Sequence, residues 1–348
     1  MKTCYVILER SLITLSFRQI GGAGLGPAVF FLETNKSSHY WGLVIMEYLP
    51  DGGFDEEFNN YNVNKDDMAE IGSLLGQLHT LPTTEVVQAA SLARNLVLEQ
   101  GMEQETVEEL FTSRGGFPFF LILWWKKWLP DWMAKYAPQN HPLPQSNVDR
   151  FLNLIVKVSR MKSLTAELSK LGFSHMDIWH GNLMRKREKI VAIDCETATV
   201  APAFLDFGGI LWNSKSLNHG QPYLNRIFRE ALVLSFYQSI GKNCHQIRDA
   251  LYDLELAFIH RQLFCILCIH FDLVTKPLSV VENIGRLLME KTEMMVSGME
   301  KALEDENTMK DVLEKGIYWA IRDELPDGHE ENIKKCVSTF EIVDTNLS

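Results

Sequence analysis

The feature that most constrains this chain is a polar loop followed at once by two short extended runs. The loop reads HMDIWHGN from His175 to Asn182, and the runs NLMRK and KIVAID meet near residues 187–188. Between Lys189 and Asp194 the second run is apolar, which is typical of a buried strand. A tight turn makes the runs antiparallel, so Asp194 at the end of the second run returns beside Asn182. The sequence therefore predicts a hairpin that joins the loop and Asp194 in one site.

Two kinds of site fit this segment. As a metal site, His175, Asp177 and His180 could bind zinc or iron, although no further histidine stands in a matching motif. As a phosphoryl-transfer site, the loop has an aspartate two residues after a histidine, and an asparagine five residues after that aspartate. Asp177 would then position a hydroxyl, while Asn182 and Asp194 would bind magnesium. We favour this second hypothesis because it explains more residues.

The rest of the chain predicts few strands, all early, and then many helices. Residues 9–24 (ERSLITLSFRQIGGAG) predict a helix that ends at the glycines, and residues 26–34 and 40–49 predict a hairpin of apolar strands. Residues 65–81 predict an amphipathic helix with an acidic first turn. Helical patterns dominate from residue 225 onward. This order favours an α+β protein with two lobes.

Composition excludes several classes of function. The formal net charge of −11 argues against nucleic acid, whose phosphates require a basic surface. Six scattered cysteines do not form a disulfide framework, so we expect a reducing, cytoplasmic setting. Cys265 and Cys268 form a lone C-x-x-C in an apolar helical pattern, where core packing is favoured over zinc. The apolar run at residues 116–125 is about half of the ~20 residues that a transmembrane helix needs, so no transmembrane segment is predicted.

Together these segments resemble the aminoglycoside phosphotransferase and choline/ethanolamine kinase group, relatives of protein kinases. The resemblance rests on FSHMDIWHGNLM, VAIDCE and FLDFGGILW, and extends with gaps over roughly residues 9–295. In choline/ethanolamine kinases a later aspartate lies twelve residues after the metal aspartate, with glycine two residues beyond. Asp206 and Gly208 match both spacings from Asp194. Upstream, GAGLGPAVFF resembles the group's G-L-G-P segment, IMEYLPDG its hinge, and IGSLLGQLHTLP the helix after the hinge.

The resemblance implies a two-lobed, protein-kinase-like α+β fold with a truncated N-terminal β lobe and a mainly helical C-terminal lobe. The expected parts are a partial N-terminal lobe with hinge and following helix (1–82), a helical lobe with the catalytic loop and hairpin (83–300), and an acidic helical tail (301–348). The implied activity is ATP-dependent phosphorylation of a small-molecule hydroxyl with Mg²⁺. Choline or ethanolamine is the leading acceptor, ahead of an aminoglycoside or another small alcohol.

The resemblance also assigns roles to individual residues. The expected set is Asp177 as the catalytic base, Asn182 and Asp194 as magnesium ligands, the backbone of Glu47, Tyr48 and Leu49 at adenine, His175, Glu196 and Asp206 as supporting residues, and Trp179 and Trp212 as weak substrate contacts. His175 would brace the loop, and Asp206 would accept hydrogen bonds from the loop backbone. Glu196 would either offset a cationic substrate or metal, or form a structural pair.

Three departures from the group's pattern open an alternative. The group has a glycine-rich phosphate loop and a strand lysine before its first helix, whereas about eight residues precede Glu9 here. The aromatic box for choline is not evident, with Phe264 and Phe271 in the late helix, and the N-x-R before the last aspartate is replaced at residues 201–203. We therefore expect either a fragment of a longer protein or weakened ATP binding. The alternative function is a catalytically weakened, kinase-like binding or scaffold protein.

Overall fold

Within the described part of this computed structural model, the strands form three antiparallel pairs. The described residues are 17–34, 42–50, 53–54, 64–84, 150, 153–154, 158, 163–195, 198–211, 226–275 and 300. The strand pairs are β1 (Val29–Thr34) with β2 (Gly42–Met46), β3 (Leu171–Ser174) with β6 (Thr199–Pro202), and β4 (Leu183–Lys186) with β5 (Lys189–Ala192). The helices are α3 (Lys65–His79), α9 (Ala166–Ser169), the 3-10 turn η2 (His180–Asn182), α10 (Phe204–Leu211), α12 (Arg226–Ser239) and α13 (Ile247–Thr275).

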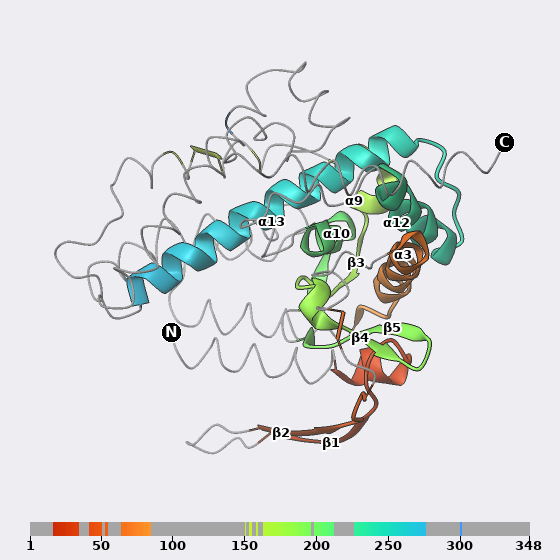
Figure 1. Cartoon of the computed structure of the whole chain (residues 1–348), viewed down its shortest axis with the longest axis vertical. Coiled ribbons are helices and arrows are strands. Elements are labelled where there is room, and N and C mark those ends of the chain that lie inside the picture. Colours follow the sequence, from red (N-terminus) through yellow and green to blue (C-terminus); the bar gives the residue numbers. More distant parts are fainter. Residues whose placement is uncertain are drawn as a thin grey trace.

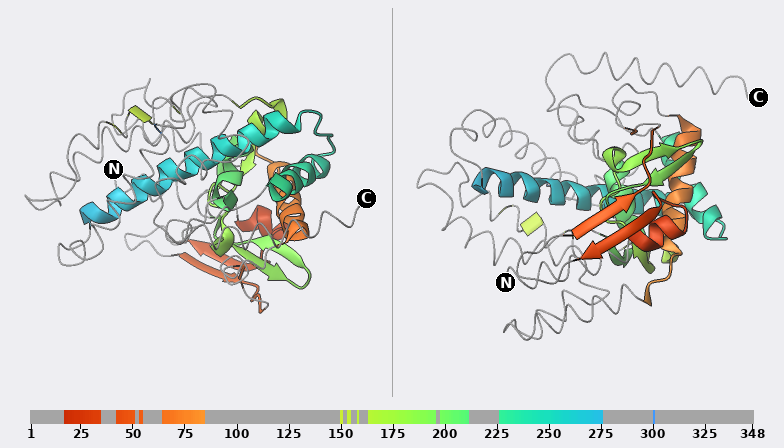
Figure 2. Two further views of the ribbon diagram at one scale, coloured as in Figure 1. Left: turned by 45° about the horizontal axis from the view of Figure 1, so that its top comes forward. Right: turned by 90° about the horizontal axis from the view of Figure 1, so that it is seen from below.

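Within the described part, helices and strand pairs pack against one another, and α3 contacts both β3 and β5. Figure 1 shows the β1–β2 pair at one end and α13 crossing the other, with the β4–β5 hairpin, β3 and α10 between them. Helices α3 and α12 pack against each other, and α10 packs against α13, as the further views in Figure 2 also show. This mixture of helices and antiparallel sheets confirms the predicted α+β class.

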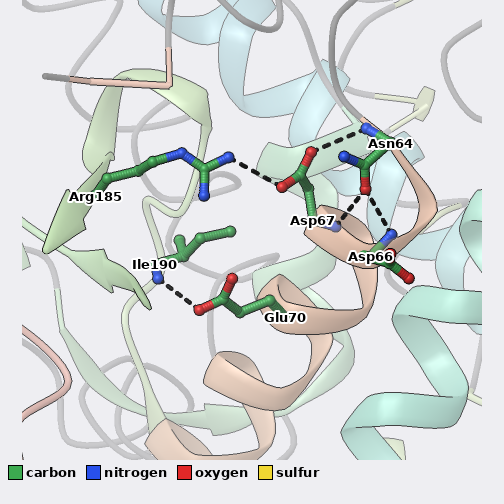
Figure 3. Close-up of polar contacts among 6 residues, drawn as sticks. All are labelled: Asn64, Asp66, Asp67, Glu70, Arg185 and Ile190. Atoms are coloured by element: carbon green, nitrogen blue, oxygen red, sulfur yellow. Dashed lines mark hydrogen bonds and ion pairs between the residues drawn. The ribbon is translucent and has the colours of Figure 1, made fainter. Parts of the chain in front are cut away.

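Helix α3 begins and packs as its sequence predicts. The Asn64 side chain accepts hydrogen bonds from the amides of Asp66 and Asp67, at 2.8 and 3.0 Å, and the Asp67 carboxylate accepts one from the Asn64 amide (Figure 3). This reciprocal capping box satisfies amides that have no partner inside the helix. Farther along, a Cβ on Gly72 would clash with the carbonyl oxygen of Leu232. Glycine therefore lets the backbones of α3 and α12 approach closely.

The two predicted hairpins are confirmed. In β4–β5, Leu183 pairs with Ala192 and Lys186 pairs with Lys189, so two residues form the connecting turn. The first turn residue, Arg187, has φ 60°, in the left-handed region that tight hairpin turns require. The last three residues of β5 are buried, whereas Lys189 is exposed. A short turn and an apolar return strand thus fix the register locally.

The glycine-rich stretch at residues 21–26 lies against the β4–β5 hairpin. The Leu25 carbonyl accepts a hydrogen bond from the Ala192 amide at 2.8 Å. A Cβ on Gly26 would lie 2.8 Å from the Ala192 carbonyl oxygen, and Gly24 has φ 72°. This stretch therefore uses its glycines for a turn and a close backbone approach. Its contact is with the end of the strand that leads to Asp194.

Several sequence predictions fall on residues outside the described part. These are the apolar run at 116–125, the tail at 301–348, Glu196, Trp212, and the side chains of Phe264, Cys265, Cys268 and Phe271. Within the described part, no helix combines the length and the apolar character needed to cross a membrane.

Candidate active site

Asp177 and Asn182 are in direct contact in the loop that follows β3. The Asn182 side-chain nitrogen Nδ2 donates to the Asp177 carbonyl oxygen at 2.8 Å and to the Asp177 carboxylate Oδ2 at 3.0 Å. Because the amide nitrogen faces Asp177, the amide oxygen Oδ1 of Asn182 is directed to the other side. Asn182 is buried, whereas the Asp177 side chain is 28% exposed. The pair therefore has one fixed amide oxygen and one carboxylate that solutes can reach.

Asp194 follows the last hydrogen bond of the hairpin. The Ile193 amide donates to the Asn182 carbonyl oxygen at 2.9 Å, which extends the β4–β5 pairing beyond Ala192. Asp194 itself has φ 57°, a conformation that aspartate tolerates better than most residues. Partial burial raises the pKa of the Asp194 carboxyl above its ordinary value, and the like charge of Asp177 raises it further. A cation bound between the two carboxylates would offset this repulsion.

The oxygen atoms of this site suit a hard cation. Magnesium is typically bound by one or two carboxylates together with water and phosphate oxygens. Asn182 and Asp194, the expected magnesium ligands, supply an amide oxygen and a carboxylate of the kind that magnesium accepts, and the Asp177 carboxylate lies beside Asn182. Among the described residues, no three His, Cys, Asp or Glu side chains are placed to hold a metal ion.

His175 connects the loop to the hairpin instead. Its ring nitrogen Nε2 lies 2.9 Å from the Ile193 carbonyl oxygen, immediately before Asp194. Burial lowers the pKa of His175 to about 4, so the imidazole is neutral at pH 7, and the hydrogen on Nε2 is assigned from its carbonyl partner. This contact holds the start of the loop against the residue that precedes Asp194.

Asp206, at the start of α10, holds the backbone of the same loop. Its two carboxylate oxygens accept hydrogen bonds from the amides of His175 at 2.9 Å and Met176 at 2.7 Å. Met176 has φ 65°, which is strained for a residue with a long side chain. Burial raises the pKa of Asp206 to about 6, even though these hydrogen bonds oppose the rise. The buried carboxyl therefore fixes an unfavourable backbone conformation next to Asp177.

Two glycines let α10 fit between the loop and α13. A Cβ on Gly209 would clash with the Ile178 carbonyl oxygen of the loop. A Cβ on Gly208 would clash with the Ala257 carbonyl oxygen and lie 3.0 Å from Cβ of Arg261, both on α13. The packing of α10 on α13 therefore explains why residue 208, two positions after Asp206, is a glycine. The same contact fixes the distance between the loop and Arg261.

Arg261 is the site residue that sequence reasoning missed. Its guanidinium nitrogen Nη1 lies 2.7 Å from the Asp177 carboxylate Oδ1, and its side chain is only 12% exposed. The available signal was a charged residue inside the apolar run AFIHRQLFCILC, because a buried charge is usually paired. That signal indicates a partner but does not identify it.

Helix α3 supports both strands of the hairpin, as Figure 3 shows. Asp67 Oδ1 pairs with Arg185 Nη2 of β4 at 3.0 Å, and Glu70 Oε1 accepts a hydrogen bond from the Ile190 amide of β5 at 2.7 Å. The Arg185 guanidinium also lies 4.5 Å from the ring centroid of Phe54. These contacts position the hairpin that carries Asp194.

Glu47 joins three segments at the predicted hinge. Its amide donates to the Ala28 carbonyl at 2.8 Å, and its carboxylate Oε2 accepts from the Ala28 amide at 3.0 Å and from Lys186 Nζ at 2.6 Å. The Lys186 hydrogen bond, followed by that of Ala28, lowers the pKa of Glu47. Beyond it, Tyr48 is exposed and Leu49 is buried. The Glu47 amide is therefore already hydrogen-bonded to Ala28. The sequence had predicted that adenine meets the backbone of Glu47, Tyr48 and Leu49.

Of the two tryptophans expected near the substrate, one lies in the described part. Trp179 is half-buried, and its ring meets the ring of His180 at a centroid distance of 4.9 Å and an angle of 80°. A Cβ on Gly181 would fall against the same tryptophan ring. Trp179 therefore packs over the turn η2. Glu196 and Trp212 lie outside the described residues.

The titration of Asp206 gives a testable dependence of stability on pH. The folded carboxyl keeps its proton up to about pH 6, whereas the unfolded one releases it near 3.8, so the folded state binds more protons between these values. The stability that Asp206 contributes therefore falls as the pH rises through this window. With about 1.4 kcal/mol per pKa unit, the advantage of wild type over Asp206→Asn should shrink by up to about 3 kcal/mol between pH 4 and pH 7.

Urea unfolding of both proteins at several pH values measures this change. Burial lowers the pKa of His175 and of His260 to about 4, which acts in the opposite direction. Both histidines are present in wild type and in the variant, so their effect cancels in the difference. If the difference in free energy of unfolding between wild type and Asp206→Asn stays constant from pH 4 to pH 7, Asp206 does not titrate in this way.

The fold and this arrangement of residues match what is expected of a kinase-like phosphotransferase. A loop aspartate bonded to an asparagine, followed by an aspartate at the return of a hairpin, is the arrangement of that class. The sequence profile of the phosphotransferase enzyme family matches residues 16–236, which is more than half of the chain. The chain belongs to this family. None of the curated proteins matches it.

Solved structures agree on the fold. The chain is similar to an ethanolamine kinase of Plasmodium vivax, with a TM-score of 0.56 and 14% identity over 82% of this chain and 70% of that chain. It is also similar to a choline kinase of Cryptosporidium parvum Iowa II, with a TM-score of 0.53 and 11% identity over 88% of this chain and 79% of that chain. At these identities the likeness concerns the fold, and it confirms the kinase-like α+β class.

Proposed function

We propose that this protein uses ATP to phosphorylate the hydroxyl group of a small molecule. The observation that carries the proposal is the contact of Asp177 with Asn182, next to the hairpin that returns Asp194. In this site Asp177 positions the acceptor hydroxyl and receives its proton. Asn182 and Asp194 would hold magnesium, which would neutralise charge on the transferring phosphoryl group.

The supporting contacts explain how the chain keeps these groups in place. His175 and Asp206 hold the loop backbone, and Asp67 and Glu70 hold the hairpin. Because phosphoryl transfer depends mainly on positioning and electrostatic stabilisation, such fixed groups contribute directly to rate. Asp177 can then act without moving the backbone that carries it.

Adenine would bind at the segment that follows β2. The Glu47 amide is bonded to Ala28, so the backbone of Tyr48 and Leu49 is the better candidate for the base. Residues 1–16, where a phosphate-binding lysine would be sought, are outside the described part. A catalytically weakened, kinase-like binding or scaffold protein is the alternative function. A cytoplasmic location is proposed from the scattered cysteines.

The acceptor is proposed to be a small alcohol. Resemblance and the names of the two similar structures suggest choline or ethanolamine. A quaternary ammonium requires aromatic faces and a nearby carboxylate, for which Trp179, Trp212 and Glu196 are the weak candidates.

Calorimetric titration with ATP tests the nucleotide part of the proposal. In the presence of Mg²⁺ we expect saturable binding, and removal of Mg²⁺ with EDTA should weaken it by at least about tenfold, because the metal would offset the repulsion between the carboxylates of the site and the phosphates. The matched control is Glu188→Gln, an exposed change at the hairpin turn, which should bind like wild type. No heat of ATP binding with or without Mg²⁺ would favour the scaffold alternative.

A further inference from the structure

Each carboxylate oxygen of Asp177 has a different partner. Oδ2 accepts from the Asn182 amide nitrogen at 3.0 Å, and Oδ1 pairs with Arg261 Nη1 at 2.7 Å. Oδ2 therefore already accepts a hydrogen bond on the side of the carboxylate that faces Asn182. An acceptor hydroxyl that approaches Asp177 from the other side must therefore bond to Oδ1. That oxygen is the one held by a guanidinium.

The guanidinium is fixed by packing. Arg261 projects from α13, whose backbone meets α10 at Gly208 so closely that any side chain there would clash with Ala257. The Arg261 side chain is only 12% exposed, and Ile259 and Leu263 on either side of it are buried. Arg261 therefore cannot swing freely into solvent when an acceptor binds. It remains a permanent positive charge within contact distance of the acceptor.

We propose that Arg261 determines acceptor specificity, and that the acceptor carries an anionic group next to its hydroxyl. This inference rests on the proposed function, in which Asp177 receives the acceptor hydroxyl. A carboxylate or phosphate on the acceptor binds the guanidinium through charge-assisted hydrogen bonds, while the neighbouring hydroxyl bonds to Asp177 Oδ1. The hydroxyl oxygen attacks the γ-phosphorus and its proton passes to Asp177. The bond from that phosphorus to the bridging oxygen breaks, and ADP leaves with the electron pair.

The same geometry disfavours a choline-like acceptor. The hydroxyl and the ammonium of an amino alcohol are separated by two carbon atoms, so a hydroxyl at Oδ1 brings the ammonium close to the guanidinium. Like charges at that distance repel, and the Asp177 carboxylate is already paired with Arg261, so it offers the ammonium less compensating attraction. Arg261 thus selects against the amino alcohols that resemblance suggests. An acidic acceptor turns the same charge into a binding contact.

A matched set of acceptors tests the inference. Glycolate, ethylene glycol and ethanolamine are two-carbon alcohols that differ in charge beside the hydroxyl, and glycerol phosphate replaces the carboxylate by a phosphate. Phosphorylation of each is measured with ATP and Mg²⁺ as kcat/KM, and binding is measured separately by ligand-observed NMR with ADP and Mg²⁺. The variants are Arg261→Gln, Arg261→Lys, and the control Arg248→Gln, an exposed change on the same helix. Thermal unfolding checks that each variant is folded.

We expect wild type to prefer glycolate or glycerol phosphate over ethanolamine by at least about tenfold in kcat/KM. Arg261→Gln should lose at least about tenfold more activity toward the anionic acceptor than toward ethanolamine. Arg261→Lys should keep part of the preference, since it keeps the charge but not the planar donor pair. Arg248→Gln should match wild type. A higher kcat/KM for glycolate indicates a carboxylate as the acidic group, and a higher value for glycerol phosphate indicates a phosphate.

Other results would overturn the inference. A wild-type preference for ethanolamine would do so, as would an equal loss toward all acceptors in Arg261→Gln, which indicates a structural role only. If no acceptor is phosphorylated but Arg261→Gln abolishes binding of the anion, the proposed reaction fails and the specificity inference stands. If no anionic probe binds wild type, the inference is wrong whether or not ATP is used.

Discussion

Asp177→Asn is expected to lower kcat for acceptor phosphorylation by about 10²–10⁴-fold, the usual contribution of a positioned general base. The amide retains an oxygen that can accept from Asn182 or Arg261, so the fold should persist, but it cannot receive the proton of the acceptor hydroxyl. The measurement is ADP release in a coupled assay with saturating ATP and acceptor. Thermal unfolding of the same sample reports whether the variant is folded.

The matched control for Asp177→Asn is Asp66→Asn, which makes the same chemical change at an exposed position in the first turn of α3. Its kcat should equal that of wild type within a factor of about two, because the interaction of one exposed charge with a helix end is weak. Undiminished turnover in Asp177→Asn would remove Asp177 from the catalytic role. Equal losses in both variants would point to a general effect of charge on the protein.

Asp194→Asn is expected to separate magnesium binding from folding. Loss of the carboxylate should weaken Mg²⁺ binding and lower kcat/KM by at least about 100-fold, since even residues that only support metal ligands are worth about 10–100-fold. Without metal, burial and the charge of Asp177 raise the pKa of Asp194. The ionised carboxylate is therefore less stable in the folded state than in the unfolded state. The metal-free variant should therefore unfold at the same temperature as wild type or slightly above it.

Thermal unfolding with and without Mg²⁺ and ADP gives the second measurement for Asp194. Wild type should be stabilised by the two ligands together, as any protein is by ligands that bind only its folded state, and the variant should not. Glu188→Gln, an exposed change at the turn of the same hairpin, should behave like wild type in both assays. Stabilisation by Mg²⁺ and ADP that is equal in all three proteins would exclude Asp194 as a metal ligand.

The core of the candidate site could be predicted from sequence because it is local. Asp177, Asn182 and Asp194 lie on one loop and the hairpin that follows it, and a two-residue turn with an apolar return strand fixes their relative positions. Helix α3 could be predicted as well, because its acidic first turn and the spacing of its apolar residues are local features of the sequence. In each case hydrogen bonds between near neighbours decide the structure.

The supporting contacts are different in kind. Arg185 pairs with Asp67 from 118 positions away, and Lys186 pairs with Glu47 from 139 positions away. Neither partner carries a local pattern that identifies the other, because surface charges of either sign occur throughout the chain. Their pairing follows from how α3 and the hinge pack on the β4–β5 hairpin.

The sequence by itself determined the class of this protein, its hairpin and the three residues of its proposed metal and base site, because short-range spacing controls them. Tertiary structure alone decided which charge faces Asp177. Arg261 reaches it only because glycines 208 and 209 bring α10 against both α13 and the loop, and such backbone distances depend on packing between segments remote in sequence. Substrate preference is therefore proposed to depend on a contact that only the folded chain contains.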